Sequence, residues 1–209
     1  MTLEVDPAPG TATVTLEAMG SARSMRWLKP DPVPSELIEQ LLWAATRATS
    51  PSNQQPWQFV VVQDPIIRTE IGQLAASLIP SDPPSHEHLD PSTRRTVDGG
   101  LHLLASLGDA PAIVIVCGSE AALRGPRRPH HLCSALFAAS QNLIVAARAV
   151  GLGAAFTTLH EHFEPQLRRL LAIPDDHSIA ATIAVGYPAR PFGPVSRRPL
   201  TDVVHHDRW

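Results

Sequence analysis

The sequence contains only two cysteines and no long block of like charges. Cys117 lies in an apolar, strand-like run and Cys133 in a helical run, where free thiols are usually buried. We therefore expect a reduced, cytoplasmic protein. The formal net charge is only -3, and no run of one sign is longer than a pair of residues. This pattern argues against a protein that binds nucleic acid.

Signals for export and for membrane insertion are also missing. We find neither the basic start and apolar core of a signal peptide nor an apolar run long enough to cross a bilayer, so we expect no membrane association. Residues 1–12 are rich in Pro, Ala, Thr and Gly and are expected to form a flexible leader. Residues 13–209 are long enough for a single domain with one sizeable core.

The motifs of nucleophilic and metal-dependent enzymes are absent as well. There is no nucleophile elbow and no phosphate-binding P-loop, and Gly151-Leu152-Gly153 follows a helix and lacks the third glycine of a dinucleotide fingerprint. The His-x-His pair at residues 86–88 and the cluster of His130, His131 and Cys133 lack further ligands at suitable spacing. We therefore predict neither a side-chain nucleophile nor a metal site.

Helical and strand-like periodicities alternate along the rest of the chain, and prolines mark the connections between them. The predicted helices span about 14–20, 35–47, 64–78, 130–150 and 163–172, and the predicted strands 57–62, 110–117, 153–159 and 178–187. Residues 80–98 break the regular pattern and are expected to form a mobile excursion. Together with residues 124–130 they are candidates for a substrate lid.

The predicted helix at residues 130–150 is apolar almost all round. Such a helix is expected to be buried on every side, which in a chain of this size favours sharing it with a second subunit. The C-terminal tail ends in Trp209, whose indole is expected to pack against the body or a partner.

Two stretches carry candidate binding residues. The loop from Thr49 to Trp57 is dense in uncharged donors and acceptors, which suit a planar heterocycle better than acid–base chemistry; a polar turn before a strand is the alternative. In the second stretch Arg23, Ser24 and Arg26 can converge on one anionic group, or form a solvated basic turn. The same two interpretations, attraction of an anionic coenzyme or plain solvation, apply to the loop arginines Arg94, Arg95, Arg124, Arg127 and Arg128.

Five motifs in order resemble the FMN-dependent nitroreductase family. They are Arg23-Ser24-Met25-Arg26, the Ser50-to-Trp57 loop, the helix ending in Gly151-Leu152-Gly153, Ile173-Pro174-Asp175 before Val185-Gly186-Tyr187-Pro188, and Arg197-Arg198-Pro199-Leu200. The resemblance covers nearly the whole chain from Ser21. It implies an α+β fold with a mixed central sheet flanked by helices, and an intertwined homodimer with two FMN sites at its interface.

The resemblance also implies roles for particular residues. Those expected at the FMN phosphate and ribityl chain are Arg23, Ser24, Met25 and Arg26, with Arg197 or Arg198 from the tail. Those expected to meet the FMN of the other subunit are Ser50, Pro51 and Asn53, and those expected near the redox-active ring edge are Thr157 and Thr158. Ala22 and Val195 stand where many or some members have a basic residue, so one phosphate contact departs from the family pattern.

The implied chemistry belongs to the cofactor. NADPH or NADH would donate hydride, and an electron-poor acceptor such as a nitroaromatic, quinone or enone would then take its place in a ping-pong cycle. Two alternatives stay open. One is the same fold with different flavin chemistry, such as reductive dehalogenation, flavin fragmentation or ene-reduction. The other is a non-catalytic, dimeric flavin-binding protein.

Overall fold

The computed structural model describes residues 12–82, 86, 88–123 and 129–209, and its secondary structure confirms the α+β class. The leader expected at residues 1–12 falls almost wholly outside the described residues. The helices and strands, in chain order, are α1 Ala12–Ser21, α2 Ser35–Ala45, β1 Trp57–Val62, α3 Pro65–Ala76, α4 Pro91–Ser106, β2 Ala112–Ser119, α5 Pro129–Ala149, β3 Gly153–Thr157, α6 Glu164–Leu171 and β4 His177–Gly186.

The four strands form one sheet in the order β1-β2-β4-β3. Every neighbouring pair of these strands runs antiparallel, whereas the family resemblance implied a mixed sheet. Parallel pairing among the described residues is confined to an isolated bridge between Ser24 and Ala154 at the free edge of β3. Residue periodicity indicates that a strand exists but not its direction, which depends on how the long connections cross the sheet.

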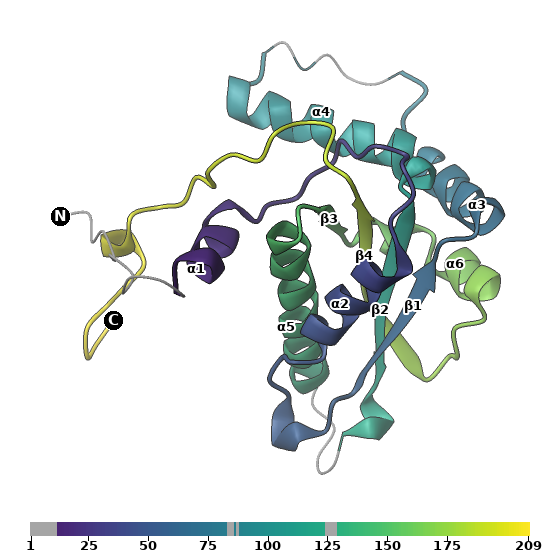
Figure 1. Ribbon diagram of the computed structural model, residues 1–209. Helices are drawn as coiled ribbons and strands as arrows, with labels where there is room; N and C mark the ends of the chain where they lie inside the picture. The colour runs from purple at the N-terminus through teal and green to yellow at the C-terminus, as the bar shows by residue number, and fades with distance from the viewer. Residues whose placement is uncertain (1–11, 83–85, 87, 124–128) are drawn as a thin grey trace.

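The sheet is covered on both faces, so it is the middle layer of three (Figure 1). Helices α2 and α5 cover one face, and α3, α4 and α6 pack against the other. Strand β2 is buried along its whole length. Its Val114 and Val116 belong to the core on the α5 side, whereas Ile113 and Ile115 belong to the core on the α3 side. The near-continuous apolar run of β2 follows from this two-sided burial.

Helix α5 is buried on one side only within the single chain. Leu136 and Leu143 are buried against the sheet and α2, but Phe137 is 44 % exposed and Cys133 is also exposed. Within one chain, therefore, Cys133 is not buried as expected, and the predicted burial of α5 on every side would need the second subunit that the sequence favours, which stays a prediction. Cys117 is buried as predicted, and burial raises the pKa of its thiol to about 11.

By length and composition alone, the segment His130–Ala149 of α5 could cross a bilayer, contrary to the sequence analysis. A core helix of a soluble protein meets the same two criteria, and one such helix is weak support for a membrane span. The contacts of α5 with the sheet and with α2 account for the apolar residues on its buried side.

Helix α4 corrects the expectation of an irregular excursion over residues 80–98. The carboxylate of Asp90 accepts hydrogen bonds from the backbone N–H groups of Ser92 (2.9 Å) and Thr93 (3.2 Å), and Pro91 occupies the first turn. A hydrogen bond from the side chain of Thr93, followed by these two backbone hydrogen bonds, lowers the pKa of Asp90. The irregular segment therefore ends at Asp90. Residues 124–128 of the other proposed lid segment lie outside the described part of the chain.

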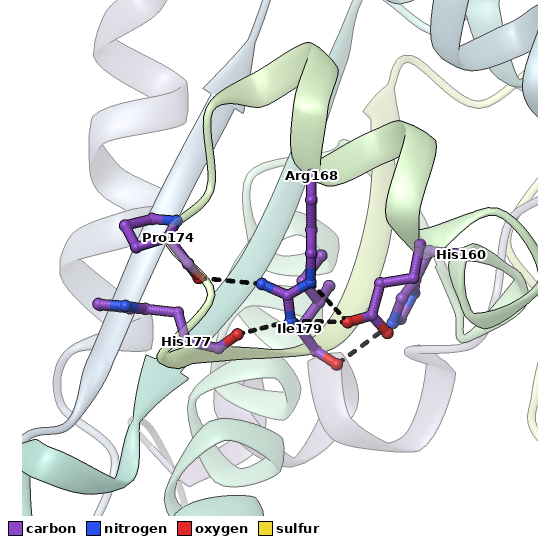
Figure 2. A network of polar contacts seen from close by, with 6 residues as sticks. His160, Arg168, Pro174, His177 and Ile179 are labelled. Atoms are coloured by element: carbon purple, nitrogen blue, oxygen red, sulfur yellow. Dashed lines mark hydrogen bonds and ion pairs between the residues drawn. The ribbon is translucent and has the colours of Figure 1, made fainter.

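The connection between α6 and β4 is held by Arg168 (Figure 2). Its guanidinium donates to the carbonyl oxygens of Pro174 (3.0 Å) and His177 (2.6 Å) and contacts the Glu164 carboxylate at 2.6 Å. In the same region the Nε2 atom of the buried His160 lies 3.2 Å from the carbonyl oxygen of Ile179. The guanidinium thus adds a donor to two backbone carbonyls of this connection, and the carbonyl oxygen of Pro174 also accepts from the N–H of His177 at 3.1 Å.

Candidate functional site

The segment that follows α1 lies along the free edge of β3. The backbone N–H of Met25 donates to the carbonyl oxygen of Ala154 at 2.8 Å. This close approach requires Gly153, since a Cβ atom there would lie 2.8 Å from Leu28 Cδ2 and 3.0 Å from Met25 Cβ. The glycine in the Gly151-Leu152-Gly153 motif therefore fixes the place of the Arg23-to-Arg26 segment beside the sheet.

The C-terminal tail returns to the same place. It leaves the end of β4 and runs toward α1 (Figure 1), where the N–H of Val195 donates to the carbonyl oxygen of Gly20 at 3.2 Å. The guanidinium carbon of Arg148, at the end of α5, lies 4.2 Å from the centre of the Phe192 ring, and its Nε donates to Ser21 Oγ at 2.8 Å. These contacts bring Arg197 next to the N-terminal segment.

The N-terminal segment, the tail and α4 enclose a cavity of about 550 Å³. Its lining residues are Arg23, Ser24, Met25, Arg26, Trp27, Ser92, Arg95, Thr96, Asp98, Arg190 and Arg197. Among ion pairs between described residues, none involves Arg23, Arg26 or Arg197, and no described residue accepts a hydrogen bond from the guanidinium of Arg23 or Arg26. A cluster of cations without counter-ions is suited to an anionic group such as a phosphate.

A second cavity, of about 350 Å³, adjoins the first and shares Arg23, Ser24 and Arg197 with it. Its apolar wall comes from α5 and β3, where the rings of Phe137 and Phe156 lie 6.2 Å apart between centroids. The two cavities together offer an anion site next to an apolar surface. That combination fits a ligand with a flat ring system and an anionic tail.

The predicted loop residues Ser50, Pro51 and Asn53 line neither cavity. Pro51 and Asn53 lie in a short 3-10 turn, Pro51–Asn53, before β1, and Ser50 directly precedes it. Ser50 Oγ accepts a hydrogen bond from the N–H of Gln55 at 3.0 Å. Ser52 (φ 52°), Asn53 (φ 53°) and Gln55 (φ 49°) all have left-handed backbone conformations. Such strain is costly and clusters at binding sites. The prediction that this loop reaches the cofactor of a partner stays a prediction.

The remaining predicted residues lie outside the two cavities. Thr157 is buried at the end of β3, where its Oγ1 accepts a hydrogen bond from the N–H of Leu159 at 3.1 Å. Thr158 is exposed, and Arg198 lines neither cavity. Trp27 and Arg190 are among the lining residues that were not proposed from the sequence. Nothing in their local pattern distinguishes them, because the contact between them depends on the return of the tail.

A comparison with protein-family models matches residues 20–187 to the nitroreductase family. The chain belongs to this family. Both the N-terminal arginine segment and the end of β4 fall inside the matched region, while Arg197 lies beyond it. The resemblance inferred from the five sequence motifs is thus confirmed.

The relatives of this nitroreductase-family chain are named after different activities. A NADH dehydrogenase from Thermus thermophilus is 31 % identical over 201 residues, which cover 87 % of this chain and 90 % of the relative. Iodotyrosine deiodinase 1 from Rattus norvegicus is 28 % identical over 189 residues, covering 83 % of this chain and 62 % of the relative. A solved structure from Desulfovibrio desulfuricans, assigned as a nitroreductase in complex with FMN, is 27 % identical, with a TM-score of 0.70 and coverage of 97 % and 99 %.

Proposed function

We propose that the protein is a homodimeric, FMN-dependent oxidoreductase of the cytoplasm. It takes hydride from NADPH or NADH and reduces electron-poor acceptors such as nitroaromatics, quinones or enones in a ping-pong cycle. The observation that carries this proposal is the cluster of Arg23, Arg26 and Arg197 beside the edge of β3, which forms no ion pair with any described residue. Family membership and the FMN of the Desulfovibrio desulfuricans structure support the same assignment.

The donor set suits FMN in particular. Guanidinium groups bind phosphate oxygens through paired hydrogen bonds, and the hydroxyl of Ser24 adds a neutral donor between them. The adjoining cavity supplies the apolar surface of Phe137 and Phe156 for the ring system. Val195, at the position where some members have lysine, lies in the tail just before Arg197, so the tail still brings one cation to this place.

When bound, FMN would supply the hydride chemistry between the nicotinamide and the acceptor. The chain's own residues would anchor the phosphate, position the ring beside β3 and exclude water from its apolar side. Thr157 and Thr158, at the end of β3, are the residues proposed near the redox-active ring edge. No side-chain nucleophile takes part in this scheme.

The homodimer is supported by apolar side chains that one chain leaves in water. Phe137 on α5 is 44 % exposed, Met19 on α1 is 53 % exposed and Leu200 in the tail is 53 % exposed. Trp209 does not pack against the body of its own chain, because it is fully exposed and stacks on His205 with 4.4 Å between ring centroids. A second copy that covers these side chains would complete the fold and bring its Ser50, Pro51 and Asn53 to the cofactor.

The first test of the proposed function is the visible spectrum of the purified protein, recorded before and after anaerobic addition of NADPH or NADH. We expect a flavin spectrum that is bleached by at least one of the two coenzymes. A protein that cannot be reconstituted with FMN would contradict the proposal. Bound FMN that neither coenzyme reduces would instead indicate a flavin-binding protein or another electron donor.

A complementation experiment tests the shared site. Arg23→Gln removes a phosphate contact, and Asn53→Gly removes the loop amide while tolerating the positive φ of residue 53. Each variant alone is expected to bind FMN weakly. After the two variants are unfolded and refolded together, about a quarter of all sites would be intact if each site takes Arg23 from one chain and Asn53 from the other. No recovery would mean that Arg23 and Asn53 do not meet across an interface.

Reductive dehalogenation is the second candidate function. It is favoured by the relative from Rattus norvegicus, which is named an iodotyrosine deiodinase. The discriminating assay mixes chemically reduced protein with iodotyrosine and with a nitroaromatic compound, and measures iodide release against loss of the nitro group. Iodide release that exceeds nitro reduction would favour dehalogenation over the first proposal.

A further inference from the structure

The larger cavity has more lining residues than the predicted FMN set uses. After Arg23, Ser24, Met25, Arg26 and Arg197 are assigned to FMN, the remaining lining residues are Trp27, Ser92, Arg95, Thr96, Asp98 and Arg190. Ser92, Arg95, Thr96 and Asp98 come from α4, Trp27 comes from the segment after α1, and Arg190 comes from the tail after β4. Two of them are arginines, and one is an acid.

The α4 residues form a stripe that faces the N-terminal segment. Ser92, Arg95 and Thr96 are spaced by three and four residues, so they lie on one face of the helix. Gly99 continues this face, and a Cβ atom there would lie 3.1 Å from Arg26 Cδ. The lack of a side chain at Gly99 lets α4 pack closely on Arg26, and the stripe then forms a wall of the cavity.

Arg190 reaches the cavity from the other side and is held on Trp27. Its guanidinium carbon lies 3.6 Å from the centre of the Trp27 ring, a cation–π contact. The Trp27 ring also stacks on His102 of α4, with 4.8 Å between centroids and an angle of 11°. Burial, and secondarily the charge of Arg190, lower the pKa of His102. A neutral His102 therefore adds no further charge near Arg190 at neutral pH.

The cavity carries more positive charges than the single phosphate of FMN requires. Between described residues, no ion pair involves Arg95 or Arg190, although Asp98 lines the same cavity and the charge of Arg95 contributes to the lowered pKa of Asp90. FMN brings one phosphate, which carries at most about two charges near neutral pH. Arg23, Arg26 and Arg197 already offer three cations to that phosphate. Arg95 and Arg190 are therefore available to a second anionic group.

We propose that Arg95 and Arg190, with the hydroxyls of Ser92 and Thr96, form a second anion subsite that binds the molecule exchanging hydride with the flavin. This inference rests on the proposed function. The anionic group expected there is a phosphate of the nicotinamide coenzyme, and a carboxylate on the electron acceptor is the other source of the same chemistry. The subsite selects among anionic partners and leaves the affinity for FMN to the Arg23 cluster.

The test uses three variants: Arg95→Gln, Arg190→Gln and the double variant that combines them. The control is Arg94→Gln, which removes one positive charge from the residue next to Arg95, and Arg94 does not line the cavity. FMN dissociation constants, measured by flavin fluorescence, are expected to change less than about twofold. The KM for NADPH is expected to rise about tenfold per variant with little change in kcat, the size of one lost charge-assisted hydrogen bond. The dissociation constant of NADP⁺, from its perturbation of the flavin spectrum, is expected to rise in parallel.

The substrate dependence of the effect identifies the anionic group. A KM that rises for NADPH but not for NADH would identify the 2′-phosphate as the bound group. An equal rise in KM for both coenzymes would identify the pyrophosphate, and a rise in KM confined to carboxylated acceptors would identify the carboxylate of the acceptor. Weakened FMN binding in Arg95→Gln, or an unchanged KM for every substrate, would overturn the inference. Wild-type protein that binds no FMN would overturn the proposed function as well, so the two failures are distinguishable.

Discussion

Two groups of arginines in this protein differ in the partners they have. Arg168 donates to two backbone carbonyls and pairs with Glu164, and Arg68 donates to the carbonyl oxygens of Gly108 (3.1 Å) and Ala110 (2.7 Å). Arg23 and Arg26 have no such partners among the described residues and line a cavity instead. The first group stabilises connections between secondary-structure elements, whereas the second is available to a ligand.

The two groups differ in whether the folded chain provides acceptors for the N–H donors of the guanidinium. A guanidinium has five N–H donors, and burial without acceptors is costly, so a satisfied arginine is a structural element. A cluster of unsatisfied cations repels itself and is stabilised when an anion binds. The two groups should therefore respond oppositely to substitution, one in stability and the other in ligand affinity.

The largest expected effect is on FMN affinity. In a double variant, Arg23→Gln with Arg197→Gln, we expect FMN binding to weaken about a hundredfold, because two charge-assisted contacts to phosphate are lost. The melting temperature of the FMN-free protein should stay within about 1 °C, since neither residue pairs with a described carboxylate. Arg47→Gln, an exposed arginine that lines neither cavity, is the matched control. A loss of stability comparable to the loss of affinity would remove the distinction between the two groups.

The converse effect is expected for Arg168. Replacing it with Gln removes the guanidinium donor to the carbonyl oxygens of Pro174 and His177, of which the first keeps the N–H of His177, and leaves Glu164 without its cation. We expect this to cost about 2–3 kcal/mol of the free energy of unfolding in urea. Arg168→Lys should recover only part of this loss, because an ammonium cannot reproduce the planar fork. FMN affinity of the folded variant should be unchanged. Full recovery with lysine would mean that charge alone matters there.

Arg68 is expected to show a smaller loss of the same kind. It joins α3 to the turn before β2 through neutral carbonyl acceptors and pairs with no carboxylate in the part of the chain that the structure describes. We expect Arg68→Gln to lower the free energy of unfolding by about 1–2 kcal/mol, measured in the same urea series. A loss as large as that of Arg168→Gln would indicate that Glu164 adds nothing to the Arg168 contacts.

The smallest expected effect is the contribution of His160, which lies near the Arg168 connection, to the pH dependence of stability. Burial lowers the pKa of His160, which also lies 3.3 Å from the Thr182 hydroxyl through its Nδ1 atom. The unfolded chain, with an ordinary pKa of about 6.5, takes up the proton first as the pH falls. The stability contributed by neutral His160 is therefore complete above about pH 6.5 and is lost as the pH falls toward the folded pKa. His160→Gln should reduce the dependence of the melting temperature on pH between pH 7.5 and 5.5. An unchanged pH dependence would mean that it comes from other groups, such as His102.

Much of this arrangement was predictable from local pattern. The apolar periodicity predicted α2, α3, α5 and the strands, because each depends on neighbours within one turn or one pleat. Helix α4 was missed although Asp90-Pro91 repeats the capping pattern of Asp64-Pro65 before α3, because the surrounding prolines and acids suggested a loop. Periodicity also could not tell whether the outer face of α5 meets its own chain or another.

The candidate site shows the same limit. The arginines near the start of the chain and in the tail were predicted from motif order, which a family resemblance preserves. The pairing of Arg190 with Trp27 was not, since it depends on the hydrogen bond from the N–H of Ala189 to the carbonyl oxygen of Trp27, which joins distant parts of the chain. Which arginines lack partners is also a property of the folded chain and not of any local pattern.

The most direct measurement compares the dissociation constants of FMN and riboflavin for the wild-type protein, at fixed ionic strength. The two ligands share the ring system and ribityl chain and differ only in the phosphate. If Arg23, Arg26 and Arg197 hold that phosphate, FMN should bind at least about a hundredfold more tightly than riboflavin. The difference should shrink to about tenfold or less in the Arg23→Gln, Arg197→Gln double variant. Equal affinity for FMN and riboflavin in the wild type would contradict the account, because the cluster would then have no anion to bind.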